Sequence, residues 1–156
     1  MTRKKKIISG LVIVFVIAQF FQPTKNQGNL EPIALFLVET QAPNEVKQIL
    51  KHACFDCHSS VTNYPWYNTI APVSYWIEDH ISEGKKHLNF SEWETYSTKK
   101  KDHKIEELVA EVQEGEMPLK SYTWTHGGLT EEELKGLVAW AERNRVIYQY
   151  ALKYKN

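Results

Sequence analysis

The sequence predicts an all-α fold, with a small helical domain following an N-terminal apolar segment. Apolar residues recur at helical spacing in several stretches, and residues that begin or end helices separate these stretches. The alternation of apolar and polar residues that is typical of half-buried strands is scarce. A chain of 156 residues with this pattern is long enough for one helical domain.

Residues 1–22 are predicted to be a signal peptide or an N-terminal membrane anchor. Arg3 to Lys6 are basic, and the run from Ile7 to Phe21 is apolar. This run is shorter than the ~20 residues that span a bilayer comfortably, but it has the length of a signal-peptide core. Val16-Ile17-Ala18 is a poor cleavage site, so removal and retention both remain open. In either case the positive-inside rule predicts export, with the rest of the chain in the periplasm.

Residues 23–42 are predicted to be a linker or arm, and residues 43–156 the folded domain. The linker begins with polar, loop-forming residues, and the conformation of its apolar run from Ile33 to Val38 stays open. Helix boundaries in the domain are indicated by Asn44 as a cap, Pro72 as a first helical position, Ser91 as the cap of a short turn, Gly115 as a stop, and Thr130 with Glu133 as a capping box.

Both cysteines of the chain fall in one pentapeptide, Cys54-Phe55-Asp56-Cys57-His58. C-x-x-C-H is the attachment pattern of a covalent c-type haem. Two thiols three positions apart on one helical turn can add to vinyl groups on one edge of the porphyrin, and the next imidazole can ligate the iron. A dithiol redox pair and half of a zinc site are the alternatives, but two cysteines exclude a four-thiolate zinc site. The prediction is one haem c, with its iron, per chain.

Met117 is predicted to be the distal iron ligand. Apart from the initiator it is the only methionine, and it lies in a loop after the Gly115 helix stop. A neutral thioether favours ferrous iron and raises the reduction potential, which suits electron transfer. An ordinary core role for Met117 is the alternative. His126, on a loop that follows, is the second candidate for the distal position.

The other histidines and the aromatic residues have less specific predictions. His80 lies beside the apolar face of the helix that starts at Pro72 and can approach a pocket. His52, His87 and His103 are predicted to lie on the surface. The aromatic side chains around the two ligand segments are predicted to cover the porphyrin or to belong to the ordinary core. They are Tyr64, Trp66, Tyr67, Tyr75, Trp76, Tyr122 and Trp124.

From about Ile49 to Trp140, the chain resembles a family of small haem-binding domains of exported bacterial proteins. The matching strings are Cys54-Phe55-Asp56-Cys57-His58-Ser59, Tyr64-Pro65-Trp66-Tyr67, Ile70-Ala71-Pro72-Val73-Ser74, His87-Leu88-Asn89-Phe90-Ser91-Glu92-Trp93 and Gly115-Glu116-Met117-Pro118. The resemblance implies a cytochrome c-like helical domain with thioethers at Cys54 and Cys57, His58 as proximal ligand and Met117 on the distal side. It implies no particular electron donor or acceptor.

Three functions follow from these predictions. The leading one is a one-electron carrier between redox partner proteins in the periplasm. The second is a five-coordinate, peroxidase-like haem enzyme, with His80 or His126 as acid/base group. The third is a haem-based sensor of a gas or of redox state. The chain has 19 basic and 19 acidic residues, and it is slightly acidic without its N-terminal cluster, which argues against a nucleic-acid partner.

Overall fold

The computed structural model describes residues 2–154, and they confirm the all-α prediction. The helices are α1 (Arg3–Ala18), α2 (Glu31–Glu39), α3 (Asn44–Ala53), α4 (Phe55–His58), α5 (Val73–His87), α6 (Thr98–Glu114), α7 (Lys120–His126) and α8 (Glu131–Tyr154), with 3-10 turns η1 (Trp66–Thr69) and η2 (Phe90–Thr95). Among these residues there is no β-strand, and the backbones of Gln27 and Val61 form an isolated antiparallel bridge.

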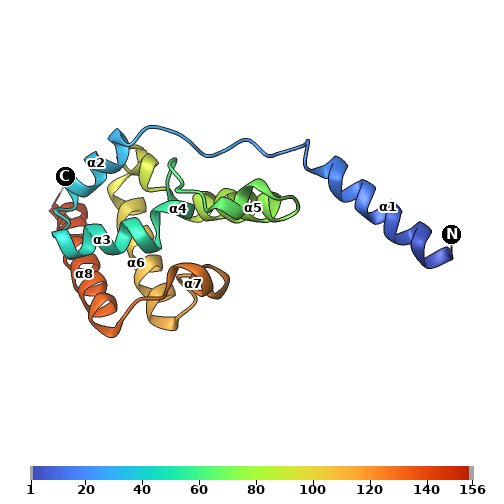
Figure 1. The fold of residues 1–156 in the computed structure, drawn as a ribbon. Helices are drawn as coiled ribbons and strands as arrows, with labels where there is room; N and C mark the ends of the chain where they lie inside the picture. Colours follow the sequence, from blue (N-terminus) through green and yellow to red (C-terminus); the bar gives the residue numbers. More distant parts are fainter. Residues whose placement is uncertain (1, 155–156) are drawn as a thin grey trace.

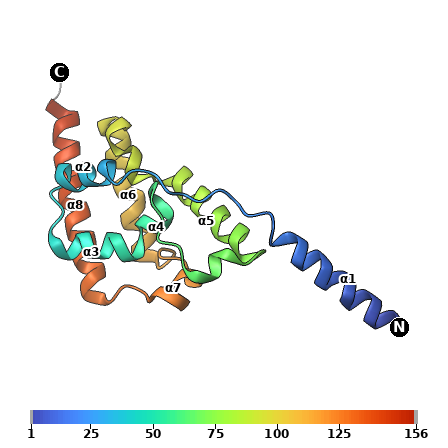
Figure 2. The same cartoon turned by 45° about the horizontal axis from the view of Figure 1, so that its top comes forward.

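The domain is built on two long antiparallel helices, α6 and α8, which pack along each other (Figures 1 and 2). Helix α3 packs on α8, and α2 covers η2. An aromatic cluster fills the space between these elements: the ring of Phe36 lies 4.7 Å from Phe90, 5.1 Å from Trp93 and 6.1 Å from Trp140. Phe36, Phe90 and Trp93 are completely buried. Large apolar area removed from water makes this cluster the main stabilising feature of the fold.

The predicted linker contains a helix that joins this core. Its apolar run, whose conformation the sequence left open, forms most of α2, and Ile33 and Phe36 are buried in the core. Further upstream, Asn26 is also buried; its side-chain amide donates to the Ser59 carbonyl and to the Thr62 hydroxyl. Residues from 26 onward are therefore held tightly against the domain.

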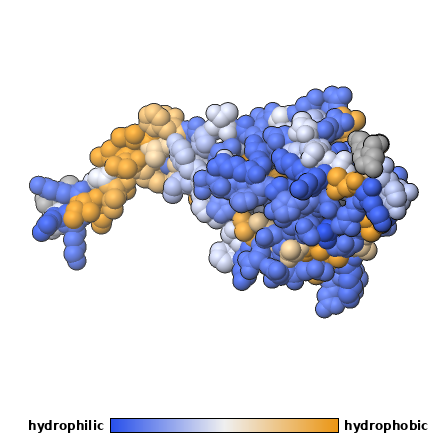
Figure 3. All heavy atoms as spheres, turned by 180° about the vertical axis from the view of Figure 1, so that it is seen from behind, coloured by the Kyte–Doolittle hydropathy of each residue, from blue (hydrophilic) through white to orange (hydrophobic). Residues whose placement is uncertain are grey.

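Helix α1 stands away from the rest of the molecule (Figures 1 and 2). Its apolar side chains from Ile7 to Ile17 are between 49% and 65% exposed and point in all directions around the helix. Figure 3 shows this apolar helix, with its basic end, beside a mostly hydrophilic domain surface. Within residues 2–154, no helix combines the length and the apolar character needed to cross a bilayer.

The predicted helix boundaries are partly correct. Thr130 and Glu133 form the capping box, with the Glu133 amide donating to the Thr130 hydroxyl over 3.2 Å and the Thr130 amide donating to the Glu133 carboxylate over 2.8 Å. Gly115 ends α6 in the left-handed region, at φ 75°. Three predictions are wrong: Asn44 lies inside α3, after Pro43; Pro72 is the N-cap of α5, which begins at Val73; and η2 is capped by the side chain of Asn89 instead of Ser91.

Candidate functional site: a cavity lined by the C-x-x-C-H motif

A cavity of about 480 Å³ lies between α4 and α5 on one side and the α6–α7 region on the other. It brings together Cys54, Cys57, His58 and Met117. Its apolar walls are completed by Ala53, Leu88, Phe90, Leu108, Val112, Leu119 and Leu129. Charged side chains also line the cavity: Asp56, Asp79, Glu83, Lys104, Glu107 and Glu111. A volume of this size with extensive apolar walls is typical of sites for cofactors.

The motif forms a short helix of its own. Helix α3 ends at Ala53, and Cys54 leaves helical geometry, with φ −127° and ψ −46°. Helix α4 then begins, and the Cys54 carbonyl accepts the His58 amide over 2.9 Å, which closes one turn. In the sequence, Val46, Ile49, Leu50, Ala53, Cys54 and Cys57 recur at helical spacing, which predicts one continuous apolar helix face through both cysteines. This prediction is wrong at Cys54, where the helix breaks. The two thiols and the imidazole nevertheless share a single turn that borders the cavity.

One hydrogen bond determines which ring nitrogen of His58 carries the proton. Its Nδ1 lies 3.0 Å from the carbonyl oxygen of Leu88, at the end of α5. Since a carbonyl can only accept, Nδ1 carries the proton and Nε2 keeps its lone pair. Burial lowers the pKa of His58, and it outweighs the Leu88 carbonyl, which raises it. A neutral imidazole with a fixed tautomer is the form that binds a metal ion.

The two cysteines form no disulfide with each other, and their surroundings favour protonated thiols. Burial, together with the neighbouring Cys57, raises the pKa of Cys54 to about 12. Burial, together with Asp56, raises the pKa of Cys57 to about 11. Reactive dithiol pairs depend on a lowered thiol pKa. The site therefore lacks the electrostatics of a dithiol exchange centre.

Helix α5 approaches the motif very closely at Gly84. A Cβ atom built on Gly84 would lie 2.7 Å from the carbonyl oxygen of Cys57 and 3.2 Å from its Cβ. Such contacts are too short for any larger residue, so glycine is required here for packing. This approach positions the end of α5 so that the Leu88 carbonyl reaches His58.

Met117 reaches the cavity from the far end of α6. The left-handed Gly115 turns the chain, and the amide of Met117 donates to the Glu111 carbonyl over 3.1 Å. Met117 is half-buried and packs against the edge of the core while it lines the cavity. The second candidate, His126, does not line this cavity. It is exposed, stacks on Tyr122 at 4.1 Å, and borders a smaller neighbouring hollow.

Tyr122 connects the Met117 region to the motif. Its hydroxyl lies 2.9 Å from Oδ2 of Asp56, inside the motif, and 2.6 Å from the carbonyl oxygen of His52. Burial and the Asp56 carboxylate raise the pKa of Tyr122, so the hydroxyl stays a donor. Asp56 also accepts the amide of Asn63 through Oδ1, over 2.8 Å. Asp56 thus joins α4 to α7 and to the loop that follows the motif.

The segment around Ser91 supports the motif from the core side. The hydroxyl of Ser91 accepts the amide of Ser60 over 2.9 Å, just after the motif. Phe90 and Trp93, its neighbours, are buried in the aromatic cluster. The string from His87 to Trp93, which resembles the haem-binding family, therefore attaches the loop after His58 to the core. Neither this contact nor the packing and hydrogen bonds of Gly84, Leu88 and Tyr122 can be recognised from the sequence alone.

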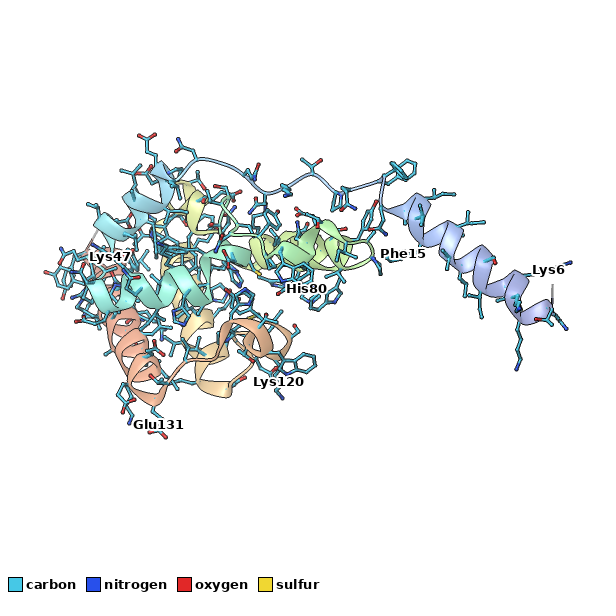
Figure 4. The ribbon with its side chains drawn as sticks, viewed as in Figure 1. Lys6, Phe15, Lys47, His80, Lys120 and Glu131 are labelled. Atoms are coloured by element: carbon cyan, nitrogen blue, oxygen red, sulfur yellow. The ribbon has the colours of Figure 1, made fainter. Side chains whose placement is uncertain are left out.

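The remaining histidines are distributed as follows. His80 borders the cavity and lies on the side of α5 that faces α7 (Figure 4), and the exposed His87 lies at the cavity rim. His52 contacts the Gln48 carbonyl, and the exposed His103 pairs with Glu107 over 3.2 Å. Within residues 2–154, no three His, Cys, Asp or Glu side chains are grouped to hold a metal ion by themselves.

The aromatic residues predicted to cover a porphyrin divide into two groups. Tyr122 borders the main cavity, and Tyr67 borders the smaller hollow beside it. Trp66 and Trp124 instead point outward and are 78% and 84% exposed. Tyr75 is also exposed, and Trp76, although 49% exposed, borders the smaller hollow with Tyr67. Tyr64 lines neither space, and its hydroxyl donates to the Glu78 carboxylate over 2.9 Å.

The comparison with protein families identifies the class of this site. Residues 13–143 match the model of a haem-binding domain family, so the chain belongs to that family. No curated protein matches the chain, and no solved structure does.

The residues present fit a haem. An imidazole with a free Nε2, two thiols and a thioether border one apolar cavity. These are the side chains that bind haem iron or a porphyrin edge in haem proteins. The protein is therefore a haem-binding protein, and iron is the metal that this cofactor brings.

Proposed function

We infer that this protein is a one-electron carrier of the cytochrome c type, with one covalently attached haem. The observation that carries the proposal is that Cys54, Cys57, His58 and Met117, from two distant parts of the sequence, border the same cavity. A haem bound there supplies reversible one-electron chemistry at its iron.

Each of the four residues has a defined role in this proposal. The thiols of Cys54 and Cys57 would hold the porphyrin as thioethers, each formed by addition of S–H across a vinyl group. His58 would bind the iron through Nε2, because Leu88 holds its Nδ1 proton. Met117 would be the second protein ligand of the iron, and its neutral sulfur would raise the reduction potential.

The proposal includes export and attachment to the membrane. Residues 3–6 are basic, and the following residues to Phe21 are apolar. By the positive-inside rule, this arrangement favours a cytoplasmic N-terminus and a periplasmic haem domain. Fractionation of cells that produce the full chain, with antibody detection of the domain, is expected to recover it with periplasm-facing membranes. Recovery in the cytoplasm would contradict this part of the proposal.

Absorption spectroscopy tests the ligation. The reduced wild-type protein is expected to be low-spin, and the oxidised protein to show the far-red sulfur-to-iron charge-transfer band. In Met117→Ala this band is lost and the reduction potential falls, whereas His126→Ala, the matched control, keeps both. A high-spin wild-type spectrum would contradict the carrier and favour the enzyme or the sensor.

A further inference from the structure

We propose that the domain rests on a phospholipid bilayer through an aromatic collar, five exposed side chains from the segment after α1, from η1 and from the first turn of α5. The collar consists of Phe20, Phe21, Trp66, Tyr75 and Trp76, which are 82%, 65%, 78%, 44% and 49% exposed. Tryptophan and tyrosine prefer the interfacial layer of membranes, where the ring is apolar and its polar tip meets water.

The end of α1 is fixed to the domain beside this collar. The side chain of Gln19 accepts the Ala71 amide over 2.9 Å and donates to the Ala71 carbonyl over 3.2 Å. The hydroxyl of Tyr75 donates to the Phe21 carbonyl over 2.7 Å. Ala71 lies in the turn between η1, which carries Trp66, and α5, whose first turn contains Tyr75. Figures 1 and 2 show this end of α5 next to the chain that leaves α1.

Because α1 is short, we expect it to hold the domain at the surface of the bilayer. Its 16 residues extend about 24 Å at 1.5 Å per residue, which is less than the ~30 Å hydrocarbon layer. A short apolar helix is accommodated when its flanking residues are drawn to the interface. Because Gln19 and Tyr75 hold the end of α1 against α5, the collar is drawn to the interface with it.

The collar also lies close to the haem cavity. The ring of Trp76 is 4.3 Å from the ring of His80, one helical turn further along α5, and His80 borders the cavity. A collar in the interface therefore holds the cavity near the membrane surface. If the protein is the proposed electron carrier, its donor or acceptor is a membrane-bound redox protein; the collar itself does not depend on that function.

Hydroxyl-radical footprinting of the full-length holoprotein in nanodiscs tests this inference. The discs contain phosphatidylethanolamine and phosphatidylglycerol and one chain each. Trp66 and Trp124 have nearly equal exposure in the structure, so they form a matched pair. Trp66 and Trp76 are expected to be oxidised several-fold more slowly than Trp124. Equal oxidation of Trp66 and Trp124, or failure of the chain to stay in the discs, would overturn the inference.

A pair of variants supplies the control. Trp66→Asp places a charge in the collar and is expected to remove the protection of Trp76, whereas Trp124→Asp is expected to leave it intact. Protection that appears only with two chains per disc would assign the collar to a second copy and overturn the inference. The haem spectrum of the same discs reports the ligation separately, so failure of the collar is distinguishable from failure of the proposed function.

Discussion

The two halves of the domain fill their interiors in different ways. The core half, made of α2, α3, η2, α6 and α8, closes on itself around completely buried aromatic rings. The cavity half, made of α4, α5, the α6–α7 loop and α7, surrounds a space of about 480 Å³. The elements of the core half pack through buried apolar side chains, and Trp140 and Asn144 of α8 also donate hydrogen bonds to the Thr40 carbonyl. In the cavity half, hydrogen bonds such as those of His58 and Tyr122 position the elements around the open space.

Because of this difference, we expect the core half to determine stability and the cavity half to determine haem binding. The two halves share a wall, since Phe90, Leu108 and Val112 belong to the core and also line the cavity. The groups that we propose to bind the haem, the thiols, the imidazole and the thioether, lie in the cavity half. Variants of the two halves should therefore have different effects.

The largest effect is expected from removing both thiols. Cys54→Ala with Cys57→Ala leaves no sulfur in the motif, so covalent haem attachment is lost completely, while the helical circular dichroism is largely kept because the core half is intact. Denaturing mass spectrometry and far-ultraviolet circular dichroism measure the two quantities. Collapse of the helical signal would show that the two halves are not independent.

In the core half, Phe36→Ala is expected to lower the free energy of unfolding by about 4 kcal/mol, because it removes a fully buried ring from the aromatic cluster. Leu35→Ala, on the same helix but 41% exposed, is expected to change it by less than about 0.5 kcal/mol. Urea unfolding measures both. Similar values for the two variants would mean that α2 is not part of the core.

The haem-free chain tests the electrostatics of the cavity half. A Cys57 pKa of about 11, against 9.0 for an ordinary thiol, makes alkylation at pH 8 about 100-fold slower in the folded chain than in urea. Because the pKa values of both thiols are higher in the folded chain than in the unfolded chain, they also contribute to stability. This contribution is complete below pH 9 and is lost as the pH rises through about 11 and 12. Iodoacetamide labelling followed by mass spectrometry checks this; fast labelling at pH 8 would restore the dithiol alternative.

Substitutions at two glycines, one in each half of the domain, test the comparison of the two halves further. Gly84→Ala introduces a methyl group 2.7 Å from the Cys57 carbonyl, and it is expected to cost about 2 kcal/mol and to reduce the yield of covalent haem. Gly136→Ala, on α8 with no atom within 4 Å, is expected to stabilise the protein by about 1 kcal/mol with unchanged yield. Thermal unfolding and haem absorbance measure these effects. An unchanged yield of covalent haem in Gly84→Ala would show that haem attachment does not require the close approach of α5 to Cys57.

The smallest effect is expected from Tyr122→Phe. It removes the hydrogen bonds to Asp56 and to the His52 carbonyl, at about 1.5 kcal/mol of stability. Because Tyr122 positions the α6–α7 region, the Met117-to-iron band is expected to weaken as well. Tyr150→Phe, on the exposed end of α8, should change neither. A Tyr122→Phe protein with a wild-type band would assign Tyr122 a structural role alone.

Patterns of local origin could be predicted from the sequence. The all-α class, the capping box at Thr130 and the helix stop at Gly115 depend on neighbouring residues only, and all three are confirmed. Local spacing also predicted the haem-binding class, because C-x-x-C-H needs no tertiary information. The helix break at Cys54 was missed, since the apolar stripe continues across it.

The contacts that position the site could not be predicted in this way. The Leu88 group that holds His58 is a backbone carbonyl, which every residue has, and Gly84 is recognised only once α5 is packed on the motif. The path from Tyr122 to Asp56 joins positions 66 residues apart. Exposure of Trp66 is likewise a property of the folded surface. Ligation by Met117 and the positions of the segment boundaries stay predictions.

Denaturing mass spectrometry of the wild-type protein, matured in a host that attaches c-type haem, tests the central claim most directly. The account predicts that one haem stays bound to the unfolded chain, on the peptide that contains Cys54 and Cys57, with no free thiol left. A colourless chain with two free thiols, or with a disulfide between them, would contradict it.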